Sequence, residues 1–244
     1  MPATLDTTLR QGADALGATL NLDPRESRLE AKILLCHALL QPRSWLAAHD
    51  RDPILPEQAA AFDALLQRRL HGEPIAYILG EREFYSLAFK VTTAVLIPRP
   101  ETELLVELAL ERLPVNRSVR VLDLGTGSGV VAVTLALRRP QAEVVAVDQS
   151  ATALEVAREN AQRLGAGNLR LMLSDWYSAL IGEKFDLIVS NPPYIAAADA
   201  HLTQGDVRFE PPAALASGTD GLDDIRAIIR GAAVHLKSGS WLLF

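Results

Sequence analysis

The fold of this chain can be worked out from Val121-Leu122-Asp123-Leu124-Gly125-Thr126-Gly127-Ser128-Gly129. An apolar run of β-forming character ends in three glycines at alternate positions, and the apolar residues 130–136 that follow suit a helix. Because glycine lacks a Cβ, the backbone here can adopt positive φ and lie directly against a ligand, with the first N–H groups of the helix aimed at it. The stretch predicts a strand, a turn that cradles a small molecule, and a helix. A turn without a ligand, the alternative, would need fewer glycines.

The spacing of the glycines indicates which kind of molecule the turn holds. A dinucleotide fingerprint requires a further glycine where this chain has Val130, and no Gly-Lys-Ser/Thr follows for a nucleoside triphosphate. Residues 143–148, Glu-Val-Val-Ala-Val-Asp, predict a second strand whose final carboxylate, Asp148, can accept both hydroxyls of a ribose. These features favour a nucleoside without phosphates. Taken alone, Asp148 would instead cap a helix or lie in solvent.

A second motif follows the predicted strand at 184–190, where the chain continues as Asn191-Pro192-Pro193-Tyr194. Neither proline can donate a backbone hydrogen bond, so the loop is stiff and its carbonyls face outward. Asn191 provides a side-chain acceptor, Pro192 a backbone acceptor, and Tyr194 a flat face for stacking. Such a pocket fits a planar NH2 group. The alternative is a double-proline turn that only ends the strand.

Composition narrows the class of protein. The 244 residues are 49 % hydrophobic and 22 % charged, as in ordinary globular proteins. Lys and Arg number 24 against 30 Asp and Glu, a net charge of −6, which weighs against a nucleic-acid substrate. Cys36 is the only cysteine, and we expect a buried thiol in a reducing compartment. No signal segment, membrane span or metal-binding spacing is evident, so we expect a cytoplasmic protein without a metal.

The chain is expected to have three parts. Residues 1–75 carry helical apolar spacing, and Asp23-Pro24-Arg25-Glu26 supplies an N-cap, a proline at the first helical position and an acid at the third. This part should be a small all-α bundle that recognises substrate. Aromatic and alternating apolar residues within 76–98 predict a β-hairpin linker. Residues 99–244 are expected to form the α/β domain. At its start, one alternative is that Arg99 and Glu101 form only a surface ion pair.

These motifs carry a resemblance to a known family. The glycine turn with Asp148 is similar to motifs I and II of S-adenosylmethionine-dependent methyltransferases, and Asn-Pro-Pro-Tyr resembles the signature of those that methylate nitrogen conjugated to a π-system. The order of motifs along the chain resembles the release factor glutamine methyltransferases. The stretches that carry this resemblance are Glu73 to Tyr77, Leu96 to Thr102, Asp123 to Gly129, Ser190 to Tyr194 and Gln204 to Pro211.

The resemblance implies a fold and a reaction. The fold would be a Rossmann-like class I methyltransferase sheet with helices on both faces, preceded by the all-α domain and the hairpin. The reaction would transfer a methyl group from S-adenosylmethionine to the side-chain amide N5 of the glutamine in the Gly-Gly-Gln motif of class 1 peptide chain release factors, leaving S-adenosylhomocysteine. The family continues past the predicted fifth strand with a helix and an antiparallel hairpin. This chain stops inside that strand at Phe244, so these C-terminal strands are expected to be absent.

The resemblance also implies roles for individual residues. Catalysis would fall to Asn191, Pro192 and Tyr194, and Pro193 would join them in binding the target amide. The residues implied in cofactor binding are Gly125, Thr126, Gly127, Ser128, Gly129, Asp148, Asp175, Trp176 and Asn191. A predicted strand at 169–174 would place Asp175 and Trp176 beside Asp148, with the adenine, although an aromatic at that position is equally suited to a core.

Two other functions use the same motifs. A nucleic-acid N6-adenine or N4-cytosine methyltransferase would apply the Asn-Pro-Pro-Tyr pocket to a flipped base, but it would need a basic track that the composition does not provide. A non-enzymatic module would bind nucleoside in the α/β domain and a partner through the helices, leaving the tetrapeptide idle. The preferred prediction is the enzyme, with release factors as partners and no membrane or direct nucleic-acid binding.

Overall fold

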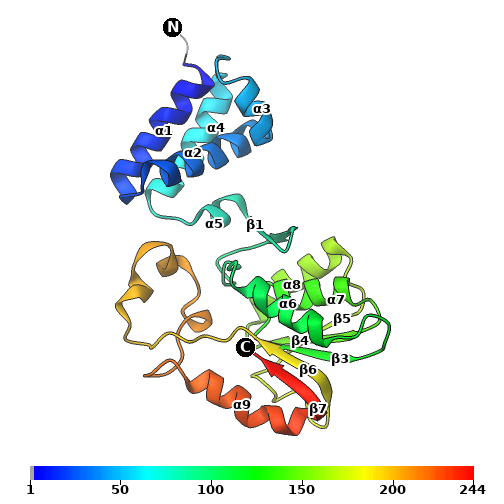
Figure 1. Cartoon of the computed structure of the whole chain (residues 1–244). Helices are drawn as coiled ribbons and strands as arrows, with labels where there is room; N and C mark the ends of the chain where they lie inside the picture. Colours follow the sequence, from blue (N-terminus) through cyan, green and yellow to red (C-terminus); the bar gives the residue numbers. More distant parts are fainter. Residues whose placement is uncertain (1–2) are drawn as a thin grey trace. The chain divides into compact units, whose positions relative to one another are not determined.

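The computed structural model describes residues 3–244 and divides into two units, Met1–Leu79 and Gly80–Phe244 (Figure 1). Residues 1 and 2 of the expected helical domain lie outside the described residues. The division falls after Leu79, whereas the sequence placed boundaries after residues 75 and 98. Within the described residues, no helix has both the length and the apolar character to cross a membrane.

The first unit is helical. Its elements are α1 (Leu5–Leu20), α2 (Pro24–Leu39), α3 (Arg43–Ala48), α4 (Pro56–Leu70) and α5 (Ile75–Leu79). The predicted cap is confirmed at α2, where the Asp23 carboxylate accepts from the N–H groups of Arg25 and Glu26 at 2.8 and 3.1 Å, and Pro24 occupies the first turn. Apolar residues from these helices form one core, in which the Cys36 thiol is buried.

Helix α5 differs from expectation. The sequence assigned the residues before Gly80 to a hairpin, but Tyr77 and Ile78 both donate backbone hydrogen bonds to Pro74 and continue as one helical turn. Ile78 belongs to the core of the first unit. Burial of this short apolar run against the helices therefore overrides its β-forming composition.

The hairpin itself is present in the second unit, as β1 (Glu81–Phe84) paired antiparallel with β2 (Leu87–Lys90). Phe84 and Phe89 are buried and meet edge to face, with ring centroids 6.1 Å apart. Both rings pack in the same core as the α/β sheet. The hairpin is thus part of the second unit.

A five-stranded parallel sheet organises this unit, with strand order β5-β4-β3-β6-β7. The strands are β3 (Arg120–Leu124), β4 (Glu143–Asp148), β5 (Leu169–Leu173), β6 (Phe185–Ser190) and β7 (Leu236–Leu243). The helices are α6 (Thr102–Arg112), α7 (Val130–Arg138), α8 (Ala151–Leu164) and α9 (Asp223–His235). The chain builds one side of the sheet from β3 outward and then returns to add β6, so the topological switch point lies between β3 and β6.

Alternate residues of the strands serve two cores. Val121 packs in the core that includes α6, α7 and part of α8, whereas the next residue, Leu122, packs in the core that includes Ile228 of α9. This period of two buries both faces of the sheet under helices, as the resemblance implied. The α/β class and the layered sheet are confirmed.

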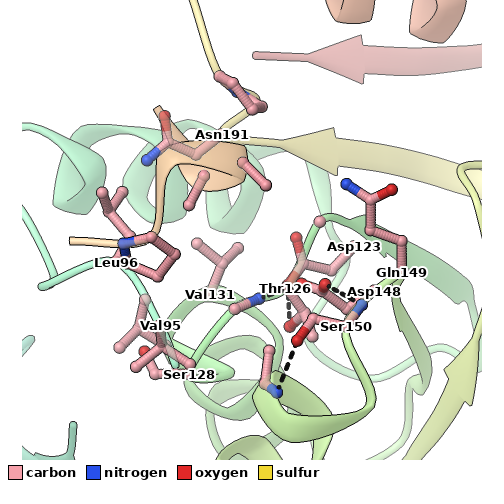
Figure 2. A pocket seen from close by; sticks show the side chains of 18 of the residues that line it. Val95, Leu96, Asp123, Thr126, Ser128, Val131, Asp148, Gln149, Ser150 and Asn191 are labelled. Carbon is pink, nitrogen blue, oxygen red and sulfur yellow. Dashed lines mark hydrogen bonds between the residues drawn. The ribbon is translucent and has the colours of Figure 1, made fainter. Parts of the chain in front are cut away.

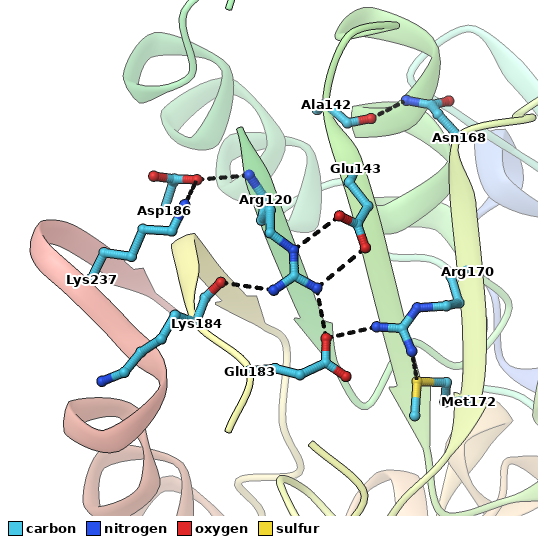
Figure 3. A network of polar contacts seen from close by, with 10 residues as sticks. All are labelled: Arg120, Ala142, Glu143, Asn168, Arg170, Met172, Glu183, Lys184, Asp186 and Lys237. Atoms are coloured by element: carbon cyan, nitrogen blue, oxygen red, sulfur yellow. Dashed lines mark hydrogen bonds and ion pairs between the residues drawn. The ribbon is translucent and has the colours of Figure 1, made fainter. Parts of the chain in front are cut away.

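The starts of the strands are joined by a charged network (Figure 3). Arg120 at the start of β3 donates to Glu143 at the start of β4, and also to Glu183, which pairs with Arg170. Asp186 of β6 accepts from the Arg120 backbone N–H and pairs with Lys237 of β7, both at 2.7 Å. The network ties the amino ends of the strands together and leaves the carboxyl ends for the site.

Candidate active site

Strand register brings the two sequence motifs together. Leu124, the last residue of β3, is aligned with Val147 of β4 on one side and with Ser190 of β6 on the other. Gly125 therefore follows β3 between the ends of the strands that lead into Asp148 and Asn191. The buried Ser190 hydroxyl donates to the Leu124 carbonyl at 2.8 Å and fixes the end of β6 against β3. The site lies at the switch point, where open α/β sheets bind ligands.

Several N–H groups of the glycine turn, ahead of the helix, donate to the protein itself. The N–H groups of Gly125 and Thr126 both donate to the Val147 carbonyl, and that of Gly129 donates to Thr126, so these donors hold the turn in shape and do not face a ligand. What the turn offers is space. Gly127 has φ +55° and lines the cavity, and a Cβ on it would meet no protein atom within 4 Å.

Asp148 is held by the turn that it faces. One carboxylate oxygen accepts from the Gly127 N–H at 2.8 Å and the other from the Ser150 N–H at 2.9 Å. The N-cap of α8 is Ser150, so the alternative of Asp148 as the helix cap is wrong. A carboxylate has about four lone-pair positions, so each oxygen can still accept from a hydroxyl. The arrangement suits a vicinal diol.

Asp123 is a second carboxyl group in the cavity lining and is 2 % exposed. The Thr126 hydroxyl donates to it at 2.7 Å. Burial raises its pKa to about 7, with a smaller contribution from the nearby Asp148 charge, while hydrogen bonds from Thr126 and the Ala132 N–H act in the opposite direction. The group is thus poised between its two protonation states near neutral pH.

Asp175 and Trp176 follow β5 and line the same cavity. Trp176 has φ +44°, and its indole N–H donates to the Asp224 carboxylate of α9 at 3.2 Å. Its side chain also contacts one of the two cores, so the ring serves both the cavity wall and the packing. The two roles that the sequence left open for Trp176 are not exclusive.

Two adjoining cavities occupy this edge of the sheet. The first has a volume of about 380 Å³, within the range of about 300–1,000 Å³ of small-molecule sites. Residues 125–128 of the glycine turn and Asp148 all line it. Figure 2 shows Asn191 and Asp148 on different sides of it. The second has a volume of about 680 Å³. Residues that line both include Leu96, Arg99, Thr102, Asn191, Pro193 and Ala214.

The tetrapeptide is divided between these cavities. Asn191 and Pro193 line both, whereas Pro192 and Tyr194 line only the second. The Asn191 amide nitrogen donates to the Thr102 hydroxyl at 3.1 Å. Tyr194 is 66 % exposed, so its ring is open to a partner. Asn191 therefore marks the junction at which a molecule in one cavity can meet a group in the other.

A buried carboxylate that the sequence left without a role closes the site. Glu210 accepts from the Ile97 N–H at 2.9 Å and forms an ion pair with Arg99, so the option of an Arg99–Glu101 pair is wrong. The side chain of Glu210 is 0 % exposed, which makes it a brace between the loop at 204–214 and the segment at 95–99. Both segments carry quoted motifs, but nothing in their separate patterns pairs them.

Two family models match the chain. The methyltransferase small domain matches residues 102–214, and the PrmC N-terminal domain matches residues 8–80.

Curated relatives match over most of their length. A release factor glutamine methyltransferase of Xylella fastidiosa (strain 9a5c) is 52 % identical over 90 % of this chain and 80 % of its own. The one from Bordetella pertussis is 56 % identical over 89 % of this chain and 80 % of its own, and the one from Escherichia coli K12 is 50 % identical over 88 % and 78 %. With its switch-point site and its helical first unit, this chain belongs to the release factor glutamine methyltransferase family.

Proposed function

We propose that this protein transfers a methyl group from S-adenosylmethionine to the side-chain amide N5 of the glutamine in the Gly-Gly-Gln motif of class 1 peptide chain release factors. The relatives named for this activity support the reaction. The observation that carries the assignment of the site is the position of Asn191 at the junction of the two cavities. The cofactor would occupy the first cavity and the glutamine side chain would enter from the second.

The first cavity fits the cofactor in three respects. The missing Cβ of Gly127 leaves room against the backbone of the 125–129 turn, where the methionine part would lie. Asp148 would hold the ribose, and Asp175 with Trp176 would hold the adenine. When bound, S-adenosylmethionine supplies an electrophilic methyl carbon on a sulfonium centre.

The second cavity fits the acceptor. An amide nitrogen is a poor nucleophile because its lone pair is delocalised into the carbonyl group. The Asn191 side-chain oxygen and the Pro192 carbonyl would accept its two hydrogens, and Tyr194 would flank its plane. Within residues 3–244 neither oxygen has a hydrogen-bond donor, so both can accept from substrate. The two acceptors would fix the nitrogen in line for displacement.

The same acceptors would lower the barrier. As the bond to the methyl group forms, the nitrogen gains positive charge, and hydrogen bonds to Asn191 and Pro192 strengthen more in the transition state than in the ground state. The proton can leave afterwards, so no strong base is required before attack.

Methyl transfer to a purified class 1 release factor tests this proposal. We expect the tryptic peptide that contains the Gly-Gly-Gln motif to gain the mass of one methylene after incubation with the cofactor. A release factor with alanine at the target glutamine is the control and should gain nothing. Methylation of duplex DNA instead would favour the nucleic-acid alternative, which the relatives do not support.

The Asn191→Ala variant tests the catalytic assignment. Turnover should fall by roughly 10²-fold or more, the loss expected for one preorganised electrostatic partner, while the cofactor Kd stays near that of the wild type. Single-turnover methylation and calorimetry measure the two quantities. An equal loss of cofactor affinity and turnover would argue against the role of Asn191 as acceptor.

The Asp148→Ala variant tests the cofactor assignment. It removes the acceptor proposed for the ribose, so cofactor affinity should fall by about tenfold or more. Calorimetric titration with S-adenosylhomocysteine gives the Kd without turnover. An unchanged Kd would remove Asp148 from the ribose site.

We place the reaction in the cytoplasm, where release factors would be encountered.

A further inference from the structure

The two ends of the Asn191 carboxamide have different surroundings. The amide nitrogen donates to Thr102 Oγ1 at 3.1 Å, whereas the amide oxygen receives no hydrogen bond within residues 3–244. Thr102 is 8 % exposed and lines both cavities. One side chain thus occupies the donor end of Asn191 and leaves the acceptor end open.

This division matters because the target NH2 group has only donors to offer. If the Asn191 amide were rotated by half a turn, its own NH2 would face the NH2 of the substrate, and neither could accept. A threonine hydroxyl both accepts and donates, so it holds the amide in place in either orientation. The two substrate N–H donors then select the orientation with the oxygen toward them.

Thr102 is itself firmly placed. It is the first residue of α6, and its N–H donates to the Arg99 carbonyl at 3.1 Å. Arg99 and Ile97 are both held by the buried Glu210 carboxylate. A β-branched side chain also has few rotamers at χ1. The Thr102 hydroxyl that meets Asn191 is therefore held by the backbone at 97–102. That backbone is in turn held by Glu210, which lies about a hundred residues further along the chain.

We propose that Thr102 is a positioning residue for methyl transfer, whose hydroxyl holds the Asn191 carboxamide in place so that the target NH2 group, once bound, meets the Asn191 oxygen. The inference rests on the proposed function, because it concerns the acceptor role of Asn191. Loss of one hydrogen bond to a neutral partner corresponds to about a tenfold effect or slightly less.

The experiment compares two variants at Thr102 with a matched control. Thr102→Val keeps the shape and removes the hydroxyl, whereas Thr102→Ser keeps the hydroxyl. Thr134→Val is the control. Thr134 is a buried helical threonine of α7 whose hydroxyl donates to the Val130 carbonyl at 2.6 Å, and it lines neither cavity. For each variant, kcat and KM for the release factor, the cofactor Kd and the Tm are measured.

The inference requires that Thr102→Val lowers kcat about tenfold at an unchanged cofactor Kd, that Thr102→Ser restores kcat, and that Thr134→Val leaves kcat unaltered. It is overturned if Thr102→Val has the kcat of the wild type. It is also overturned if Thr102→Ser is as impaired as Thr102→Val, because the effect would then come from packing.

A double-mutant cycle separates this inference from the proposed function. In an Asn191→Ala background, Thr102→Val should have no further effect, since the side chain that it positions is gone. An additive loss would overturn the inference. Full activity of Asn191→Ala alone would instead refute the acceptor role on which the inference rests, and a loss with Asn191→Ala but none with Thr102→Val would refute only the positioning role.

Discussion

Asp123 and Asp186 show how the surroundings of single carboxylates set opposite pH dependences. Burial raises the pKa of Asp123 to about 7. Partial burial also acts to raise the pKa of Asp186, but hydrogen bonds from the Arg120 N–H and Lys237 outweigh it, and the pKa is lowered. At pH values between the usual pKa of an aspartate and about 7, the folded protein binds more protons at Asp123 than the unfolded chain does. This group therefore reduces the free energy of unfolding as the pH rises through that window.

Replacement of Asp123 by asparagine should remove this loss. Relative to the wild type, Asp123→Asn should gain stability as the pH rises from about 4 to about 7, by on the order of 2–4 kcal/mol at the upper end. Asp186→Asn should behave in the opposite sense. The pKa of Asp186 is lowered in the folded protein, so its ionised carboxylate stabilises the fold at pH values above the unfolded pKa, and this stability is lost in acid. Urea unfolding from acid pH, well below the usual aspartate pKa of about 4, up to about pH 7 measures both. Parallel curves for wild type and Asp123→Asn would contradict the prediction.

Helix α9 connects elements on both sides of the site. Asp224 in its first turn accepts from the Trp176 indole, and the Asp224 N–H donates to the buried Ser217 hydroxyl at 2.8 Å. The Ser217 N–H in turn donates to the carbonyl of Ile195, directly after the tetrapeptide. The start of one helix thereby fixes both a wall of the first cavity and the loop that carries Asn191.

Loss of the Asp224 carboxylate should loosen Trp176. We expect Asp224→Ala to raise the cofactor Kd by roughly 10- to 100-fold, the usual effect of one hydrogen bond to a charged group. Asp224→Asn should retain most of the affinity, because its amide oxygen still accepts. Asp223→Ala is the control, since Asp223 forms an exposed ion pair with Arg226 and lines neither cavity. Equal Kd values for Asp224→Ala and Asp223→Ala would contradict the prediction.

At the scale of the whole molecule, the two units have separate cores, and all residues of the two adjoining cavities lie in the second. The first unit contains an ion pair between Arg69 of α4 and Glu30 of α2 at 2.8 Å, with side chains 5 % and 13 % exposed. A buried pair of this kind is costly to break because the remaining charge loses its partner.

Removal of Arg69 should thus affect one unit and spare the other. We expect Arg69→Ala to destabilise the first unit by roughly 3–5 kcal/mol and to leave the cofactor Kd unchanged. Arg28→Ala, which removes a well-exposed pair with Asp6, should change stability little. Calorimetric unfolding and cofactor titration test this pair, and a parallel loss of cofactor binding in Arg69→Ala would show that the units depend on each other.

The sequence by itself determined the local features of this protein. Alternation of apolar residues specifies which strand residues are buried, glycine and proline specify turns, and an acid at a strand end lies at the sheet edge whatever surrounds it. For this reason the strand and turn at 121–129, the end of β4 at Asp148 and the cap at Asp23 could all be predicted. The order of motifs was enough to indicate the family.

Only the tertiary structure decided which side chains meet. Asn191 and Thr102 are 89 residues apart in the chain, and Arg99 and Glu210 are 111 apart, so no local pattern relates them. Likewise, the 75–79 run became a helix because a core was available to bury it. Local periodicity indicates which face of a helix or strand is apolar. Which side chains contact one another depends on the register and packing of elements that come together only when the sheet forms.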